Sequence, residues 1–405
     1  MMQRPQPGVI SALGVVMILA WGSSVYLIAA IAGPVTADTG WPLVAVTGAF
    51  SGALAVAGLA SPAAGRLIVR HGGRAVLTGG CALLAAGLAV MAAAPSLPVF
   101  VLGWAVIGLG MAGALYDPAF ATLGRLYGAG ARGAITRLTL WGGFASTVCW
   151  PLSALLLENF GWRGTALGYA ALHLLVTIPL IRLGIPAGPG PMSGSAGAQA
   201  APERVAPDGA GLLRDGIERA AYVLIGVWLV IAGLVLVSLT THLFTFLQAQ
   251  GHTLAAAVAL GALFGPAQVA GRLLEMAGRG RYHPVWTLAG SVGLAGAGVV
   301  LLAADLGLAG IALILFGMGN GLSSIARGSL PLALFGPDRL PLVLGRLARP
   351  ALIAQAVAPV PGAWAIGALG APATLVILAA LSVLNLCVLA VLWGPVARLR
   401  QRPAR

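Results

Sequence analysis

The chain has 405 residues, of which 59% are hydrophobic and only 8% are charged, whereas about 25% of the residues in a typical soluble domain carry a charge. This composition excludes a water-soluble globular protein. The formal net charge is +13, and all the cationic side chains are arginine, since the sequence contains no lysine. Such a bias is typical of a GC-rich bacterial genome, so arginine in place of lysine is not by itself evidence of anion recognition.

Apolar runs of membrane-spanning length follow one another along the chain. A bilayer core about 30 Å thick needs roughly 20 helical residues per crossing. The runs are continuous and rich in leucine and alanine, unlike the alternating strands of a membrane barrel, so we predict an all-α integral membrane protein with twelve transmembrane helices. The predicted helices cover residues 9–33, 43–64, 75–94, 97–117, 136–157, 164–183, 221–247, 254–275, 285–304, 307–329, 342–363 and 371–394. The first run exceeds the roughly 7–15 apolar residues of a signal peptide, which favours a spanning helix.

Arginine is unevenly distributed over the predicted connections. The connections after the second, fourth, eighth and tenth runs are arginine-rich, as is the end of the sequence, whereas the alternate connections contain only Arg163. Because cytoplasmic loops carry the excess of positive charge, we expect both termini to be cytoplasmic. The expected location is the bacterial inner membrane.

One long connection divides the chain. The tract from Gly184 to Gly211 is rich in Pro, Gly, Ala and Ser and is typical of a flexible linker. The segment Leu212–Arg219 mixes both charge signs and fits either a short surface helix or a solvated lead-in to the seventh helix. We therefore predict a six-helix bundle over residues 1–183, a linker over 184–220, and a second six-helix bundle with a basic tail over 221–405.

Short motifs recur in register in the two predicted bundles. Gly65-Arg66-Leu67 recurs as Gly271-Arg272-Leu273 near the end of the second helix of each bundle. The glycine pair 108/110 recurs at 317/319, and Arg137 recurs as Arg346. Duplicated bundles with a site at their interface are the usual architecture of secondary transporters.

With these features the chain resembles the major facilitator superfamily over its whole length. The family's loop motif Gly-x-x-x-Asp-Arg-x-Gly-Arg-Arg corresponds to residues 65–74, with Val69 at the acidic position, and its second copy begins at Gly271 and keeps Glu275. The turn at residues 160–163, Phe-Gly-Trp-Arg, also resembles the family. The resemblance implies two pseudo-symmetric bundles and a cytoplasmic latch that involves Gly65, Arg66, Arg70, Gly72, Arg74, Arg137, Gly271, Glu275, Gly278 and Arg279.

The subfamily is less sharply indicated. Residues 21–24, Trp-Gly-Ser-Ser, and 38–41, Asp-Thr-Gly-Trp, resemble bacterial members of the monocarboxylate-transporter-like branch, which moves small organic anions. Ala267 stands where proton-coupled carriers of that branch place an arginine. Relatives with similar short loops export drugs or toxic oxyanions, so carboxylate transport is one of several options.

Polar side chains within the spans are the candidates for substrate contact, because each costs roughly 2.5–3.5 kcal/mol at a helix centre if charged. In the resembled family, helices one, four, seven and ten line the central cavity. The candidates are Tyr26, Asp117, His242, Gln268, Asn320, Arg327, Arg349 and Gln355.

Each candidate also has a structural interpretation. Asp117 with Pro118 fits the cytoplasmic end of helix four, His242 fits a solvated position near the outer end of its helix, and the arginines fit side chains that snorkel to water. His173 and Asn385 are expected to be structural. We also predict that Asp117 pairs with Arg327 and that Glu275 lies near Arg137, as gates between the bundles.

The sequence therefore favours a secondary transporter that moves a small anion by alternating access, with protons as the candidate coupling ion. A drug or toxic-compound efflux carrier of the same fold is the alternative. The five histidines are scattered and no Walker motif is present, which disfavours an intramembrane enzyme and an ATP-driven pump. The three cysteines lack metal-ligand spacing. We expect a monomer in the lipid bilayer without cofactor, metal or nucleic-acid partner.

Overall fold

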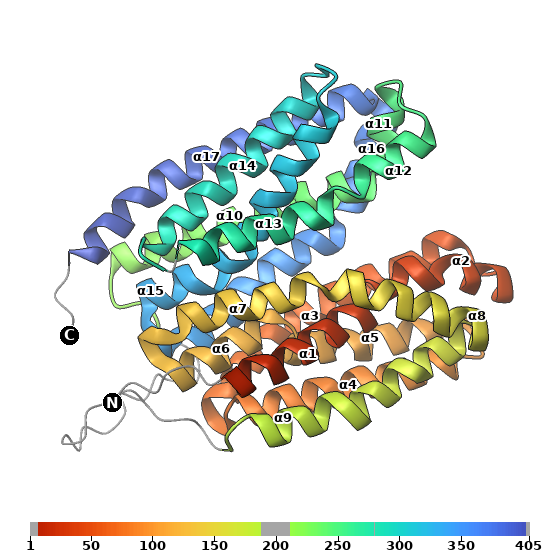
Figure 1. Ribbon diagram of the computed structural model, residues 1–405, viewed down its shortest axis with the longest axis horizontal. Helices are drawn as coiled ribbons and strands as arrows, with labels where there is room; N and C mark the ends of the chain where they lie inside the picture. Colours follow the sequence, from red (N-terminus) through yellow and green to blue (C-terminus); the bar gives the residue numbers. More distant parts are fainter. Residues whose placement is uncertain (1–6, 188–210, 279, 402–405) are drawn as a thin grey trace. The chain divides into compact units, whose positions relative to one another are not determined.

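The computed structural model describes residues 7–187, 211–278 and 280–401, and within these ranges the chain forms helices and no strand (Figure 1). Ten helical stretches in this part are long and apolar enough to cross a membrane. The protein is therefore an all-α, multi-pass membrane protein, as the composition predicted.

Two of the ten stretches are too long for one crossing. Ala131–Gly184 has 54 residues and Ala309–Leu369 has 61, whereas a helix that rises about 1.5 Å per residue crosses the bilayer core in roughly 20. Each contains a glycine in the left-handed region, Gly161 with φ 64° and Gly336 with φ 77°. A residue with a side chain is strained at such φ values, so these glycines mark bends between two successive helices.

Contacts divide the chain into two compact units. Unit 1 contains the chain up to Leu212 together with Gly336–Ala356, and unit 2 contains Leu213–Phe335 and Val357–Arg405. The segment Gly336–Ala356 thus groups with the first unit, although the sequence assigned it to the second bundle. The division into two six-helix bundles stays a prediction.

Unit 1 is built around closely packed helices. Its elements are α1 (Pro7–Ser23), α2 (Leu27–Thr39), α3 (Leu43–His71), α4 (Gly73–Ala92), α5 (Leu97–Ala114), α6 (Tyr116–Tyr127), the 3-10 turn η1 (Gly128–Gly130), α7 (Ala131–Gly143), α8 (Ala145–Leu172), the π-helical turn η2 (His173–Thr177), α9 (Ile178–Gly184) and the second part of α15 (Ala309–Val357). In Figure 1 the ribbon of α8 turns back on itself and continues into α9. The second part of α15 packs on α3, where Gly65 faces the backbone of Pro341 and Gly345 faces that of Ser61.

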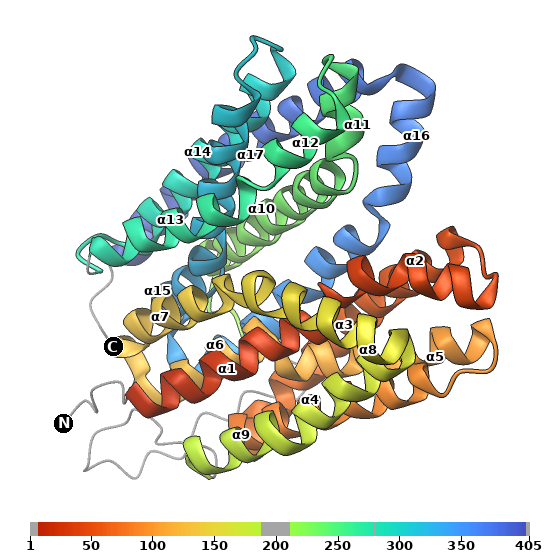
Figure 2. The same ribbon diagram turned by 45° about the vertical axis from the view of Figure 1, so that its right-hand side comes forward.

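The first predicted helix is longer than expected and interrupted. Residues 34–42 were predicted as a connection, but α2 runs to Thr39 with Pro34 inside it. Pro34 removes one backbone hydrogen bond from α2, and Ile31, Ala32 and Val35 of the same helix are buried. Between α1 and α2, the amide of Tyr26 donates to the Trp21 carbonyl at 3.0 Å. Figure 2 shows α2 continuing the course of α1 beyond this interruption.

Helix four is interrupted in the same way, and its predicted end was wrong. The helix does not stop at residue 117, because α5 ends at Ala114, Leu115 is extended (φ −87°, ψ −163°), and α6 continues to Tyr127. An acid and a proline in the first turn favour a helix start, since the acid meets the positive end of the helix dipole and proline needs no hydrogen-bond partner there. Asp117 and Pro118 therefore begin a helix instead of ending one.

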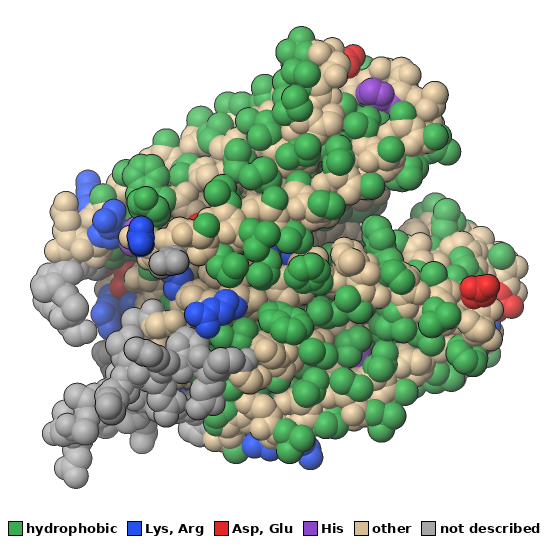
Figure 3. All heavy atoms as spheres, in the orientation of Figure 1, with side chains coloured by type: hydrophobic (Ala, Val, Ile, Leu, Met, Phe, Trp, Pro, Cys, Tyr) green, Lys and Arg blue, Asp and Glu red, His purple; other side chains and the backbone are tan. Residues whose placement is uncertain are grey.

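The residues of the family's loop motif are mostly helical. The predicted second helix, 43–64, extends to His71, so Gly65, Arg66 and Arg70 lie on α3. Only Gly72 separates α3 from α4. In Figure 3, arginine side chains on the face shown gather toward the left-hand ends of the helices.

Unit 2 contains α10 (Gly216–Thr241), α11 (Leu243–Ala249), α12 (Leu254–Gly261), α13 (Phe264–Ala277), α14 (Pro284–Ala303), the first part of α15, α16 (Pro359–Leu369) and α17 (Ala371–Arg400). The Asp215 carboxylate caps α10 by accepting from the amides of Ile217 and Glu218, both at 2.9 Å. Residues 212–215 form no separate helix, so this segment is a lead-in to α10. The preceding part of the predicted linker, residues 188–210, lies outside the described residues.

Candidate functional site

Asp117 lies where helix four is interrupted, in the first turn of α6. Its side chain is half-buried and borders a cavity of about 10 Å³ together with Ser61 on α3 and Pro341 on α15. A cavity of this size holds about one water molecule. A carboxylate thus lies within the span Leu97–Tyr127, at the N-terminus of a helix segment and beside space for water.

Aromatic rings surround the two interruptions of unit 1. The ring of Trp21 lies 5.3 Å from that of Tyr116 and 6.3 Å from that of Tyr26, which in turn lies 6.2 Å from Trp150. The Trp21 indole N–H is buried and has no hydrogen-bond partner among the described residues. We call Trp21, Tyr26, Tyr116 and Trp150 the aromatic cluster; it presents flat apolar surfaces and one unsatisfied donor.

His173 holds helix one to the π-helical turn η2. Its ring is fully buried, and its Nε2 lies 2.7 Å from Ser23 Oγ while its Nδ1 lies 3.0 Å from Thr177 Oγ1. Both ring nitrogens are therefore hydrogen-bonded. This geometry fits the structural role expected from the sequence.

The Phe-Gly-Trp-Arg turn is tied to the end of α2. The Trp162 indole donates to Asp38 Oδ2 at 2.9 Å, and Arg163 forms a salt bridge with the same carboxylate. Arg163 also donates to the Ala94 carbonyl at 3.2 Å, which fastens the end of α4. The only arginine in the arginine-poor connections thus has a partner of opposite charge.

In unit 2, Gln268 lies beside Arg272, a buried arginine that is not among the candidates predicted from the sequence. Arg272, one turn further along α13, is only 5% exposed. Its Nη2 donates to Gln268 Oε1 at 3.4 Å and its Nε donates to Ser324 Oγ on α15 at 3.2 Å. The Arg272 Nη1 atom is buried without a hydrogen-bond partner among the described residues.

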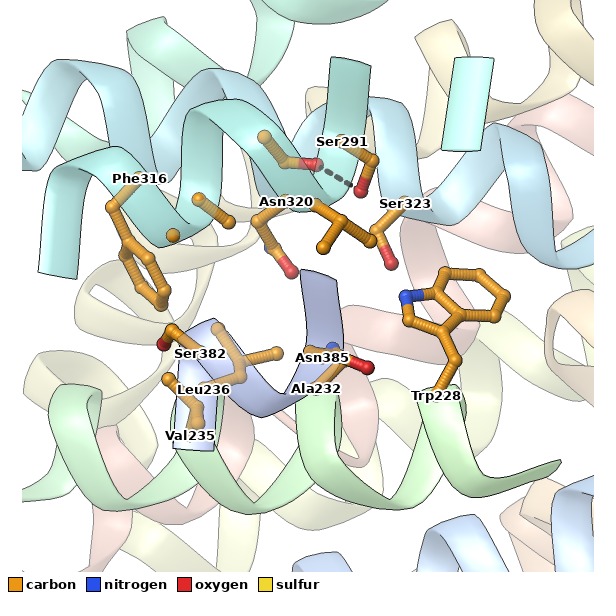
Figure 4. Close-up of a pocket in the computed structure, with 14 residues that line it drawn as sticks. Trp228, Ala232, Val235, Leu236, Ser291, Phe316, Asn320, Ser323, Ser382 and Asn385 are labelled. Carbon is orange, nitrogen blue, oxygen red and sulfur yellow. Dashed lines mark hydrogen bonds between the residues drawn. The ribbon is translucent and has the colours of Figure 1, made fainter. Parts of the chain in front are cut away.

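A mostly apolar pocket with a few polar side chains lies among α10, α14, α15 and α17 (Figure 4). Asn320 and Ser323 line it from α15, Asn385 from α17 and Trp228 from α10. Asn385 is 6% exposed, and its Oδ1 has no hydrogen-bond partner within the part of the chain described. The cavity measures about 40 Å³, which suits a few water molecules and not an organic substrate.

His242 lies at the junction of α10 and α11, half-buried, and its Nε2 is 3.2 Å from the Pro359 carbonyl at the start of α16. It is thus hydrogen-bonded at a helix interruption of unit 2. Among the other candidates, Arg327 and Gln355 are half-buried and Arg349 is exposed. Arg349 is also close to a glycine of α3, Gly58.

The predicted latch residues fall into three groups. Arg66, Arg70 and Arg137 are exposed, Arg74 and Gly278 are half-buried, and Gly65, Gly72 and Gly271 are buried at close helix contacts or ends. Arg279 lies outside the described residues. Glu275 accepts a hydrogen bond from Thr287 Oγ1 at 2.9 Å, which links α13 to α14. The pairs Glu275–Arg137 and Asp117–Arg327 each join a residue of unit 1 to one of unit 2 and stay predictions.

The sequence contained one signal for Arg272. It is the second member of the repeated Gly-Arg-Leu motif and stands four residues after Gln268, which places both side chains on one helix face. The sequence predicts a structural role for Asn385 and gives no sign of the pocket that this side chain lines.

Comparison with known proteins identifies the family. A sequence model described as the Major Facilitator Superfamily matches residues 12–345. The chain belongs to the Major Facilitator Superfamily. As a member it is a membrane transporter and not an enzyme. No curated protein is similar enough in sequence to match it.

Solved structures share the fold of this superfamily member at low sequence identity. The fucose:proton symporter FucP of E. coli is 15% identical, with a TM-score of 0.73 over 94% of this chain and 97% of that one. The human organic anion transporter MFSD10 (TETRAN) is 17% identical, with a TM-score of 0.71 over 96% and 100% of the two chains. The proton:xylose symporter XylE is 13% identical, with a TM-score of 0.69 over 93% of each chain. At these identities the similarity shows that the chain shares the fold of these transporters.

Proposed function

We propose that this protein is a proton-coupled secondary transporter of a small anion that works by alternating access. The observation that carries the proposal is the position of Asp117 at the interruption of helix four. Ionisable residues within transmembrane segments mark proton relays and substrate paths, because a charge there needs a cavity or a partner. In secondary transporters, interrupted helices hold substrate and coupling-ion sites.

Proton exchange at Asp117 needs access to water. The carboxylate borders a cavity with room for one water molecule, and the helix dipole at the start of α6 stabilises its charged form. Once protonated, the neutral acid loses that stabilisation and no longer places a charge in the span. Two of the structural neighbours, FucP and XylE, are described as proton symporters, which agrees with such coupling.

Anion transport is the substrate class that fits the arginines of the spans. Arg327 on α15 is half-buried, and Arg349 lies one helix further along the chain. Tyr26, His242, Gln268, Asn320 and Gln355 supply neutral donors and acceptors. The neighbour MFSD10 is described as an organic anion transporter, which supports the same class.

The proposed topology has twelve crossings in the bacterial inner membrane with both termini cytoplasmic. The two overlong spans each bend at a glycine, so each supplies two crossings in place of one. In this scheme the Asp117–Arg327 pair and the Glu275–Arg137 pair close the cytoplasmic side and separate when the transporter, acting as a monomer, opens inward.

Drug efflux by the same fold is the second candidate, and the aromatic cluster favours it. Flat rings at helix interruptions suit apolar or planar compounds. Import of a drug analogue into inverted vesicles, with no uptake of anions, would replace the anion proposal by this one.

The test uses purified protein in proteoliposomes at a fixed membrane potential, with labelled lactate, benzoate and phosphate as probes. We expect uptake of at least one probe to rise when a pH gradient is applied, and Asp117→Asn to abolish this rise. Asp305→Asn, which changes an exposed acid between α14 and α15, is the matched control and should keep it. Uptake by the wild type that is indifferent to the pH gradient would contradict proton coupling.

A further inference from the structure

We propose that Arg272, Gln268 and Ser324 form an oxyanion-binding site within unit 2, which takes a carboxylate or a phosphoryl group. This site rests on the proposed transport of anions and names the residues that recognise the charge. It adds Arg272 and Ser324 to the sequence candidate Gln268, since the sequence groups Arg272 with the cytoplasmic arginines.

The guanidinium of Arg272 lies deep in its span. The residue belongs to the candidate span Leu254–Ala277, and helical side chains lean toward the helix N-terminus. The hydrogen bond from its Nη2 to Gln268 Oε1, one turn earlier, shows that the side chain takes this direction. Ser324 accepts the Nε hydrogen bond from well inside α15, and Gln268, although it is in the second turn of α13, lies inside the span Leu254–Ala277.

The charge of Arg272 has only neutral partners. Arginine stays protonated under all ordinary conditions, so the free-energy cost of burying its charge cannot be avoided by loss of a proton. Within the described chain, no carboxylate forms an ion pair with Arg272, whereas the half-exposed Arg163 has Asp38. A buried charge without a counter-charge is strongly destabilising, and in membrane proteins it is a mark of a substrate path.

The repeat supplies an internal comparison. Arg66 occupies the same place in the first Gly-Arg-Leu motif and is exposed on α3, as a loop arginine is expected to be. Arg272 is 5% exposed. The motif therefore does not explain the burial of Arg272, and neither does the positive charge of cytoplasmic connections.

The donors that remain match an oxyanion. Of the five guanidinium N–H groups, one on Nε and one on Nη2 are used, which leaves both on Nη1 and one on Nη2. One N–H from each Nη atom forms the two-pronged donor that binds the paired oxygens of a carboxylate or phosphate. Gln268 accepts through its oxygen, so its amide nitrogen is left to donate to the same anion.

Close helix packing places these groups together. Gly321 on α15 lies against the Gln268 backbone, and Gly271 on α13 lies against that of Met318. A side chain at either glycine would push α13 and α15 apart. The Ser324 hydroxyl donates to the Gly321 carbonyl at 2.7 Å, so its lone pair faces the Arg272 Nε–H and fixes the plane of the guanidinium.

The first experiment measures binding by purified full-length protein in detergent, with sodium benzoate and sodium phosphate as probes and sodium chloride at equal ionic strength as background. We expect the wild type to bind at least one oxyanion. Arg272→Gln should raise the Kd of that oxyanion about tenfold or more, because the variant loses the charge-assisted hydrogen bonds. Arg272→Lys, which keeps the charge and loses the fork, should give an intermediate Kd.

Arg182→Gln is the matched control, because Arg182 is an exposed arginine at the end of α9. The Arg182→Gln protein should bind the oxyanion with the wild-type Kd.

A second measurement needs no variant. Phenylglyoxal modifies arginine, and the oxyanion that binds should slow modification of the peptide that contains Arg272, as followed by mass spectrometry. If Arg272→Gln fails to fold, this measurement still shows whether the oxyanion binds at Arg272.

Two negative results have different meanings. If an oxyanion binds and is transported but Arg272→Gln keeps the wild-type Kd, or if the oxyanion gives no protection from phenylglyoxal, the site is wrong while anion transport stands. If the wild type neither binds nor transports benzoate, lactate or phosphate, the proposed anion substrate is wrong and this site falls with it.

Discussion

Two histidines show how differently one residue type is used in this chain. His173 is fully buried with both ring nitrogens hydrogen-bonded, whereas His71 is exposed at the end of α3. A buried ring of this kind connects elements, since Ser23 belongs to α1 and Thr177 to η2. The sequence predicted the structural role of His173 from its peripheral helix but not these partners, because contacts between distant residues leave no local pattern.

His173→Ala should therefore destabilise the protein. The change removes a buried ring and two side-chain hydrogen bonds, each worth about 0.5–1.5 kcal/mol, while the Ser23 and Thr177 hydroxyls keep their backbone acceptors. We expect a lower midpoint temperature of unfolding, followed by intrinsic tryptophan fluorescence in detergent. His71→Ala should shift the stability by less than about 0.5 kcal/mol. Equal midpoints for the two variants would contradict this role.

The candidate site shows the same limit at the level of single residues. Polar residues within apolar runs could be found from the sequence, and Asp117, Gln268 and Asn320 do lie within spans. Burial could not be found in this way, because Arg66 and Arg272 stand in identical tripeptides and differ only in what packs around them. The burial of an arginine depends on the neighbouring helix, which local sequence does not encode.

At the scale of elements, apolar length predicted where helices exist but not where they are interrupted. Hydropathy is an average over a run, and the stretches Gly8–Thr39 and Leu97–Tyr127 are each apolar on average across their interruptions. The Asp117-Pro118 pair was compatible with a helix end and with a helix start, and the structure has the start. The bends at Gly161 and Gly336, in contrast, lie in the connections 158–163 and 330–341 that the sequence predicted.

The packing of α4 against α5 gives a sharp prediction for two neighbouring glycines. A Cβ at Gly80 would lie 2.5 Å from the Gly113 carbonyl carbon of α5, whereas a Cβ at Gly79 would meet nothing within 4 Å. Gly80→Ala should lower the free energy of unfolding by about 1–3 kcal/mol through overpacking.

Gly79→Ala should leave stability unchanged or raise it by up to about 1 kcal/mol, because alanine favours the helix. Both variants are compared by their midpoint temperatures of unfolding in one detergent. A Gly80→Ala protein as stable as the Gly79→Ala protein would show that α4 and α5 do not approach as closely as described.

At the scale of the whole molecule, charge distribution predicts how the chain is oriented in the membrane. Tyr282 and Leu306 flank α14 at opposite ends and are each 66% exposed. Because the arginine-rich connection precedes α14, we expect the Tyr282 end to be cytoplasmic and the Leu306 end to face outward.

This orientation can be checked by labelling in intact cells. In a background without Cys81, Cys149 and Cys387, Leu306→Cys should react with a membrane-impermeant maleimide, and Tyr282→Cys should react only after the membrane is permeabilised. The opposite pattern would reverse the proposed topology. Equal labelling of both positions in intact cells would also be incompatible with a crossing by α14.

The interruption between α1 and α2 divides one long helix into two rods of unequal length. α1 has 17 residues and α2 has 13, so the rods are about 26 Å and 20 Å long. α2 is anchored at its far end by the Asp38 interactions with Trp162 and Arg163, whereas α1 is anchored at Ser23 by His173. The interruption lets α2 change its angle to α1, and the contacts of Asp38 make α2 move together with Trp162 and Arg163. We expect α2 to tilt together with the Trp162 turn while α1 keeps its place, so that access from one side can change without bending a continuous helix.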